Sequence, residues 1–171
     1  GGDPSAWTYA WSVNGGIAAT TKSFRYTASN PDDDGSIEVP VEVRLENVPA
    51  GIDEKYTAKY LHTYTVWATP SVKRRTGTSQ TVFAGTEVQM GIAMQGGVAD
   101  GWTYEWALGG NVIGNEASIS LVPAASGTDA PVTHTYTVTA VNVCEGTEVF
   151  RQTYSYNVTV WPTPAASIPA T

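Results

Sequence analysis

The sequence has little Leu, Met or Cys and no long apolar run. Of its 171 residues, 4 are Leu, 2 are Met and 1 is Cys. A single Cys cannot form an internal disulfide, so core packing must stabilise the fold. No apolar run approaches the roughly 18 to 20 residues that cross a bilayer as a helix.

Charge is also scarce, because Asp, Glu, Lys and Arg make up 15% of the chain and leave a net charge of −7. Binding to phosphate backbones requires clustered Lys and Arg. The basic cluster Lys73-Arg74-Arg75 is short and is interpreted as part of a solvated linker. We therefore expect no nucleic-acid partner.

The chain is rich instead in 19 Val and 23 Thr, together with 6 Trp, 9 Tyr and 3 Phe. β-branched and aromatic side chains suit the pleated surface of a sheet, whereas helices prefer Leu, Met, Ala, Lys and Glu. Thr, Ser and Gly provide the polar surface in place of charges. The composition predicts an all-β protein.

An internal repeat runs through most of the chain. The segment Trp7–Trp11 (WTYAW) recurs 95 positions later as Trp102–Trp106 (WTYEW). Likewise, Thr65–Pro70 (TVWATP) recurs 94 positions later as Thr159–Pro164 (TVWPTP). All six tryptophans fall in matched positions. The offset of 95 also pairs Gly15 with Gly110, Ser23 with Ser118, Val43 with Val138 and Asn47-Val48 with Asn142-Val143.

The repeat divides the chain into modules. We expect an incomplete module over residues 1–70, a complete one over 71–164, and the start of a linker to a following module over 165–171. Residues 71–80 are interpreted as a linker that runs into a first strand. A period of about 95 residues suits an immunoglobulin-like sandwich. The chain is expected to be a piece of a longer array, whose first module lacks its first two strands.

Alternation of apolar and polar residues predicts the strands. Pro40 falls on the polar side of its strand, which predicts an edge or bulge position because proline donates no ladder hydrogen bond. The predicted strands cover residues 7–13, 23–28, 37–47 and 55–67 in the first module, and 81–84, 87–94, 102–108, 117–122, 134–142 and 147–161 in the second.

A family resemblance rests on short motifs of the second module: Tyr104-Glu105-Trp106 followed by Gly109-Gly110, the turn Ala84-Gly85-Thr86, and Tyr136–Asn142 (YTVTAVN). These motifs resemble the PKD-like branch of immunoglobulin-like sandwiches, which occur in tandem on bacterial surface and secreted proteins, notably of Bacteroidetes. Two features depart from the pattern, since no Asp follows Trp106 and Val41 replaces the aromatic residue in the first module. The resemblance implies extracellular spacer, display or adhesion modules without catalysis.

Trp7 and Trp102 open the aromatic strands of the two modules and are candidate ligand-binding residues. One interpretation places their rings in the core. The alternative is an exposed aromatic platform that stacks on sugar rings, which predicts a glycan-binding module. Solvent exposure of the two rings separates these interpretations. A different role, sealing the interface between modules, is predicted for Trp67, Pro70 and Trp161 at the proline-containing junctions.

An acidic loop offers a candidate calcium site. Asn30, Asp32 and Asp34 alternate before Gly35, as at the start of a calcium loop. The twelfth position of such a loop carries a bidentate Glu, and Val41 stands there instead. Asp and Gly are ordinary turn formers, so a solvated turn is the favoured interpretation and no other cofactor is expected.

No catalytic constellation is recognisable. His62 and His134 lie in strand segments, outside any nucleophile motif or metal-ligand spacing. We therefore expect no enzyme; the expected partners are neighbouring modules of the parent protein, another protein or a glycan. An incomplete first module exposes backbone edges that are prone to pairing. A further segment, from a second chain or from elsewhere in this one, is expected to complete its sheet.

Overall fold

The computed structural model describes residues 2–164. The chain divides into two compact units, unit 1 over Gly1–Ala68 and unit 2 over Thr69–Thr171, and each is described by itself. Within the described residues every element is a strand except η1, a 3-10 turn at Ala99–Gly101. This part of the chain holds no helix long and apolar enough to cross a membrane. The expected linker over 165–171 lies outside the described residues.

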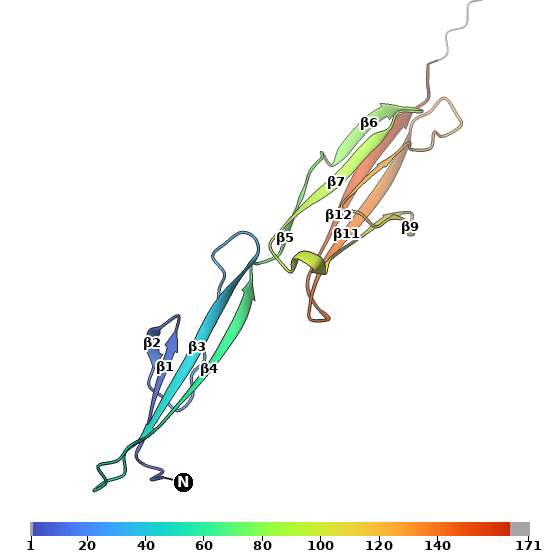
Figure 1. The fold of residues 1–171 in the computed structure, drawn as a ribbon. Helices are drawn as coiled ribbons and strands as arrows, with labels where there is room; N and C mark the ends of the chain where they lie inside the picture. The colour runs from blue at the N-terminus through green and yellow to red at the C-terminus, as the bar shows by residue number, and fades with distance from the viewer. Residues whose placement is uncertain (1, 165–171) are drawn as a thin grey trace, which may run out of the picture. The chain divides into compact units, whose positions relative to one another are not determined.

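Unit 2 is a sandwich of two sheets (Figure 1). One sheet has three strands in the order β10-β7-β5, and the other has five in the order β6-β12-β11-β8-β9. Neighbours pair antiparallel except β6 and β12, which are parallel. This is an immunoglobulin-like arrangement. The strands are β5 (Ser71–Arg74), β6 (Ser79–Phe83), β7 (Val88–Gln95), β8 (Trp102–Leu108), β9 (Asn111–Gly114), β10 (Ser118–Leu121), β11 (Val132–Cys144) and β12 (Thr147–Trp161).

The core of unit 2 lies between its two sheets. Trp106 is fully buried and lies opposite Val138 in the register of β8 and β11. Two tyrosine hydroxyls of β12 cross the sandwich: Tyr154 donates to the carbonyl of Val72 at 2.8 Å, and Tyr156 donates to that of Gly91 at 2.8 Å. These bonds satisfy polar groups inside the protein and tie the sheets together. The core cluster comprises Val72, Val88, Met90, Ile92, Trp106, Tyr136, Val138, Ala140, Tyr156, Val158 and Val160.

The segment expected to be a linker begins with a strand. β5 pairs antiparallel with β7, and its Val72 is buried. The guanidinium of Arg74 lies 4.2 Å from the centroid of the Tyr154 ring, where the ring quadrupole attracts a cation. The prediction of a linker is therefore wrong over β5, because pairing with β7 and packing against β12 give these residues partners that local sequence does not reveal. Lys73, Arg74 and Arg75 are exposed, as expected for a solvated basic cluster.

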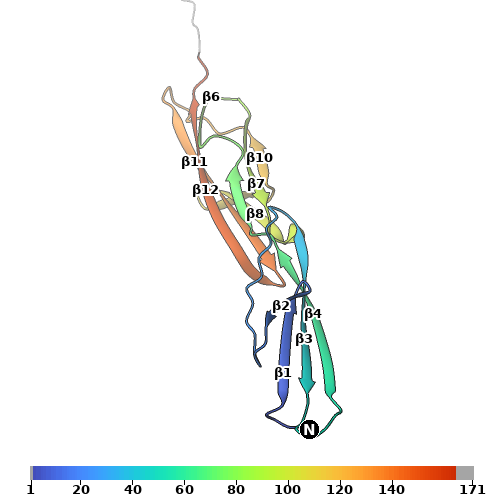
Figure 2. The same ribbon diagram turned by 90° about the vertical axis from the view of Figure 1, so that its left-hand side faces the viewer.

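Unit 1 has a single four-stranded sheet in the order β2-β1-β3-β4 (Figure 2). Its register repeats that of the five-stranded sheet in unit 2: Trp11 lies opposite Val43 as Trp106 lies opposite Val138. The predicted fold class is confirmed: the chain is all-β, with tandem immunoglobulin-like modules of which the first lacks strands. The strands of unit 1 are β1 (Trp7–Val13), β2 (Gly16–Ala19), β3 (Ser36–Asn47) and β4 (Tyr56–Trp67).

Pro40 lies in the inner strand β3, so the prediction of an edge position is wrong. Its carbonyl accepts a hydrogen bond from the Asn14 amide at 3.1 Å, and the nitrogen of a strand residue faces the same side as its carbonyl. β1 ends at Val13, opposite Val41. The proline nitrogen therefore faces a turn, and no ladder bond to β4 is lost.

Within residues 2–68, unit 1 shows no second sheet. The prediction of a strand over 23–28 is wrong, since these residues form no ladder. The segment is the counterpart of β10, whose ladder partner is β7, and within residues 2–68 no strand takes the place of β7. Among residues 2–68 no strand corresponds to β5, β6 or β7, which is three strands rather than the two expected, because the expected linker itself contains β5.

Candidate binding face of unit 1

The face of the unit 1 sheet that no second sheet covers forms a groove of about 610 Å³, called the unit 1 groove below. Its lining comes from β1 and β3, from the last residues of β4, and from the irregular segment 24–28. Arg25 adds a positive charge to a lining that is otherwise mainly apolar and aromatic. The aromatic side chains of this lining are Trp11, Phe24, Tyr26, Tyr64 and Trp67, and the valines are Val39, Val41 and Val66.

Three aromatic rings lie in a row at this groove. The rings of Trp11 and Phe24 have centroids 5.8 Å apart, and those of Phe24 and Tyr26 are stacked at 6.2 Å. The Trp11 indole donates to the carbonyl of Thr21 at 2.9 Å. The Trp106 indole of unit 2 donates ten residues ahead in the same way, at 2.8 Å. The floor of the groove is thus built like the core of unit 2.

Two tyrosines of β4, of which Tyr64 lines the groove, are more exposed than their counterparts in unit 2. Tyr64 is 52% exposed, whereas Val158 at the matching position of β12 is fully buried. Tyr60 is 64% exposed, whereas its counterpart Tyr154 packs against the core and bonds to β5. The cause is the covering sheet, which is present only in unit 2 among the described residues.

A buried asparagine holds the chain ahead of β1 in unit 1 and ahead of β8 in unit 2. The Asn47 amide nitrogen donates to the Asp3 carbonyl at 2.7 Å, and its oxygen accepts from the Asp3 amide at 3.2 Å. Asn142 makes the same pair of bonds with Val98, at 2.9 and 3.0 Å. Both asparagines are at most 1% exposed. Sequence reasoning missed this asparagine clamp, although the repeated Asn-Val pair was its signal.

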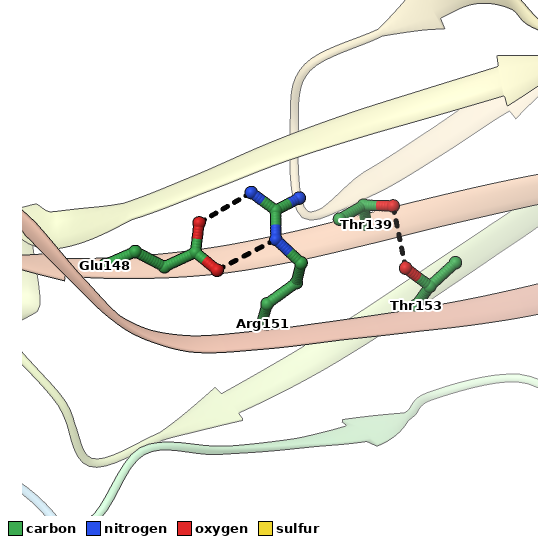
Figure 3. A network of polar contacts seen from close by, with 4 residues as sticks. All are labelled: Thr139, Glu148, Arg151 and Thr153. Carbon is green, nitrogen blue, oxygen red and sulfur yellow. Dashed lines mark hydrogen bonds and ion pairs between the residues drawn. The ribbon is translucent and has the colours of Figure 1, made fainter.

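The outer faces of the sheets carry polar contacts. Arg151 holds Glu148 through two bonds, from Nε at 2.9 Å and from Nη2 at 2.6 Å, and the hydroxyls of Thr139 and Thr153 lie 2.9 Å apart (Figure 3). The arginine lowers the pKa of the Glu148 carboxyl. These groups are exposed, so their contacts contribute little to stability.

In unit 1, Glu42 lies on the outer face between two cations. The ammonium of Lys59 and Nε of Arg44 each approach its carboxylate to 2.6 Å. The hydrogen bond from Lys59, followed by that from Arg44, lowers the pKa of Glu42. Within residues 2–164, no three His, Cys, Asp or Glu side chains gather as a metal site.

Trp7 and Trp102 are half-buried. Each ring makes an edge-to-face contact with a ring two strands away at the same end of its sheet, Trp7 with Tyr56 at 5.7 Å and Trp102 with Phe150 at 5.6 Å. The Trp102 indole also donates to the carbonyl of Gly96 at 3.1 Å. These contacts give both rings a packing role at the clamped end of the sheet, and glycan binding by them stays a prediction.

The acidic loop forms turns of the kind Asn and Asp favour. The Asn30 side chain accepts from the Asp32 amide at 2.9 Å and donates to the Val66 carbonyl at 3.1 Å. The Asp34 carboxylate accepts from the Gly35 amide at 2.9 Å. The side-chain oxygen of Asn30 and one carboxylate oxygen of Asp34 are thus bonded to the loop backbone, and calcium binding stays a prediction.

The three residues predicted to pack between modules, Trp67, Pro70 and Trp161, have different surroundings. Trp67 is 36% exposed and lines the unit 1 groove, which is a position that sequence reasoning did not expect. Pro70 is half-buried. Trp161 lies opposite Phe83 at the end of the β6–β12 ladder and is exposed. Their predicted role between modules stays a prediction.

No known protein family and no curated protein matches the chain. Solved structures resemble it at low sequence identity. An amphioxus IgVJ-C2 molecule is 13% identical, with 88% of this chain and 87% of that one covered and a TM-score of 0.47. Fibronectin(III)-like modules of Clostridium thermocellum CbhA are 12% identical, with 91% of this chain and 78% of that one covered and a TM-score of 0.38. Three N-terminal domains of the bacteriophage RB49 outer capsid protein Hoc are 16% identical, with 94% of this chain and 51% of that one covered and a TM-score of 0.44.

Proposed function

We propose that the chain consists of non-catalytic, PKD-like immunoglobulin modules that act as spacer and display domains of a bacterial protein at the cell surface or outside the cell. The supporting observation is the path of the chain through unit 2. Ser71 lies opposite Gln95 at one end of β7. Trp161 lies beside Phe83, next to the turn that leads into the other end of β7. The chain enters unit 2 at one end and leaves it at the other (Figure 1).

Unit 1 is threaded in the same way. The chain enters β1 past Asp3, which is bonded to Asn47 opposite Tyr56 at one end of the β3–β4 ladder. It leaves at Trp67, opposite Ser36 at the other end. A strand of 12 residues spans roughly 40 Å. A module threaded from end to end adds its own length to a protein, which is what a spacer requires.

The parallel pair β6–β12 gives unit 2 resistance to pulling. The Ala84 amide donates to the Trp161 carbonyl at 2.8 Å, and the Asn157 amide donates to the Thr78 carbonyl at 2.8 Å. These bonds delimit a ladder between the first and last parts of the unit. Tension applied at the two chain ends loads this ladder along the strands, so all its bonds must break together.

Single-molecule force spectroscopy of the full chain tests this proposal. In a Cys144→Ser background, handles at Thr69→Cys and Pro164→Cys load the ladder lengthwise. Handles at Thr86→Cys and Pro164→Cys lie at one end of the ladder and open it bond by bond. We expect a clearly higher unfolding force for the first pair. Equal forces, or no resolvable unfolding event for the lengthwise pair, contradict a load-bearing spacer.

A further inference from the structure

The unit 1 groove lies between two segments whose backbones lack a ladder partner. β4 pairs with β3 on one side, and no described strand pairs with its other side. The segment 23–26 pairs with no strand of the described chain. Unpaired N–H and C=O groups along such edges are a template for another strand. The groove is therefore bordered by two acceptors for strand pairing.

In unit 2 the two matching segments are both paired. β10, the counterpart of 23–26, pairs antiparallel with β7. The last five residues of β12, the counterpart of 63–67, pair with β6 in parallel. β6 and β7 follow one another in the chain, so a single strand pair fills both places. Its inward side chains Val88, Met90 and Ile92 are at most 2% exposed.

The asparagine clamp shows from which direction such a pair arrives. In unit 2 the chain leaves β7 at Gln95, passes Gly97 at φ +70°, and is held at Val98 by Asn142. In unit 1 the chain passes Gly2 at φ +85° and is held at Asp3 by Asn47. The sequence Gly1-Gly2 also matches Gly96-Gly97. The backbone before Asp3 is thus set on the course that leads out of β7 in unit 2.

We propose that the unit 1 groove is a strand-acceptor site. Its occupant is a strand pair with the apolar alternation of β6 and β7, joined to the chain on the N-terminal side of Gly2. One strand pairs antiparallel with residues 23–26 and the other pairs in parallel with 63–67. The side chains of the first fill the groove over Trp11 and Val41. Tyr60 and Tyr64 then become covered, as Tyr154 and Val158 are in unit 2.

This occupant fits the groove better than a second copy of unit 1 does. Two bare sheets packed face to face cover the aromatic side chains of both grooves. They leave the backbone of 23–26 and the open edge of β4 unpaired, and unpaired edges remain prone to further association. A strand pair satisfies both edges and covers the aromatic side chains at once.

The test adds the occupant that the chain itself provides. A copy of residues 71–95 is fused directly ahead of Gly1, so that Gln95 of the copy precedes Gly1-Gly2 as it precedes Gly96-Gly97 in unit 2. The matched control is the same fusion with Met90→Asp in the added copy alone. Hydrogen exchange with mass spectrometry then follows the amides of 23–26, of 63–67 and, as an internal reference, of β11.

We expect exchange at 23–26 and 63–67 to slow by at least about tenfold in the fused chain. The Met90→Asp control and the unmodified chain should stay fast there, and β11 should be unchanged in all three. Sedimentation velocity should find the unmodified chain monomeric at micromolar concentration. A separate peptide of residues 71–95 at the same concentration should give little protection, since it lacks the covalent connection that raises effective concentration.

Three results overturn the proposal. Exchange at 23–26 and 63–67 that is equally fast in the fused chain and in its Met90→Asp control shows that the groove accepts no strand pair. Concentration-dependent protection of 23–26 in the unmodified chain identifies a second copy as the occupant. Full protection by the separate peptide identifies a partner in trans. Loss of protection in β11 indicates that unit 2 itself has unfolded. The β11 reference therefore distinguishes unfolding of unit 2 from failure of the groove to accept a strand pair.

Discussion

Units 1 and 2 share one sheet and differ in what covers it. The strands β1, β3 and β4 repeat the register of β8, β11 and β12, the tryptophan indoles bond ten residues ahead, and the asparagine clamp is the same. Only unit 2 has β5, β6 and β7. The same sheet therefore forms one side of a closed core in unit 2 and an aromatic face without a second sheet in unit 1. Comparing the two units shows which features the sheet forms alone and which depend on the second sheet.

The largest difference is expected from the central tryptophans. Trp106→Ala removes a ring that is fully buried and should destabilise unit 2 by about 3 to 5 kcal/mol. Trp11→Ala removes a half-buried ring beside an open groove, and a cost near 1 kcal/mol is expected because little cavity is created. Hydrogen exchange of β11 and of β3 measures the two effects in one sample. Equal losses contradict the view that unit 1 lacks a closed core.

The asparagine clamps should behave alike in both units. Asn142→Ala leaves the amide of Val98 without a partner and removes one of the two bonds to its carbonyl, which still accepts from the Gly101 amide. Asn47→Ala does the same to Asp3, whose carbonyl still accepts from the Ala6 amide. Each change should cost about 1 to 3 kcal/mol, the penalty of an unsatisfied buried group. Asn157→Ala, on the exposed outer face, is the control and should cost less than about 0.5 kcal/mol. A clamp that matters in only one unit shows that the cover, rather than the sheet, requires it.

Removing one hydroxyl should separate the covered face from the bare one. Tyr154→Phe loses the bond to the Val72 carbonyl at 2.8 Å and should cost unit 2 about 1 kcal/mol. Tyr60→Phe, at the matching position, changes an exposed ring and should leave unit 1 unaltered. Chemical denaturation followed by exchange of β12 and β4 checks both. In the fused chain described above, where Tyr60 is expected to be covered, Tyr60→Phe should instead make unit 1 less stable than it is in the fused chain with Tyr60.

The smallest effect is expected from alkaline pH. Burial raises the pKa of Tyr136 and Tyr156 above the ordinary value near 10. The folded unit 2 thus keeps protons that the unfolded chain releases, so its stability is full below about pH 10 and falls as the pH rises beyond that value. Phenolate absorbance and exchange of β11 recorded from pH 8 to 11 measure this. Ionisation of both tyrosines at about pH 10 without loss of protection contradicts it.

Part of the fold and of the site was readable from local pattern. The strand limits at Trp7–Val13 and Thr147–Trp161 agree with the structure, because long alternation between turn residues leaves one register. β5 was not readable, since Val72 and Arg74 have partners only across the sandwich. The asparagine clamp was also missed, because its partners lie 44 residues away in the chain.

The sequence by itself determined the β composition, the repeat with its paired tryptophans, and the incomplete first module, because these depend on residue type and spacing alone. Tertiary structure decided which strands form and which faces are covered. Residues 118–121 and 23–26 occupy matching places in the repeat, yet only the first form a strand. The physical reason is that a strand needs a partner for its N–H and C=O groups, and β7 supplies that partner in unit 2 alone.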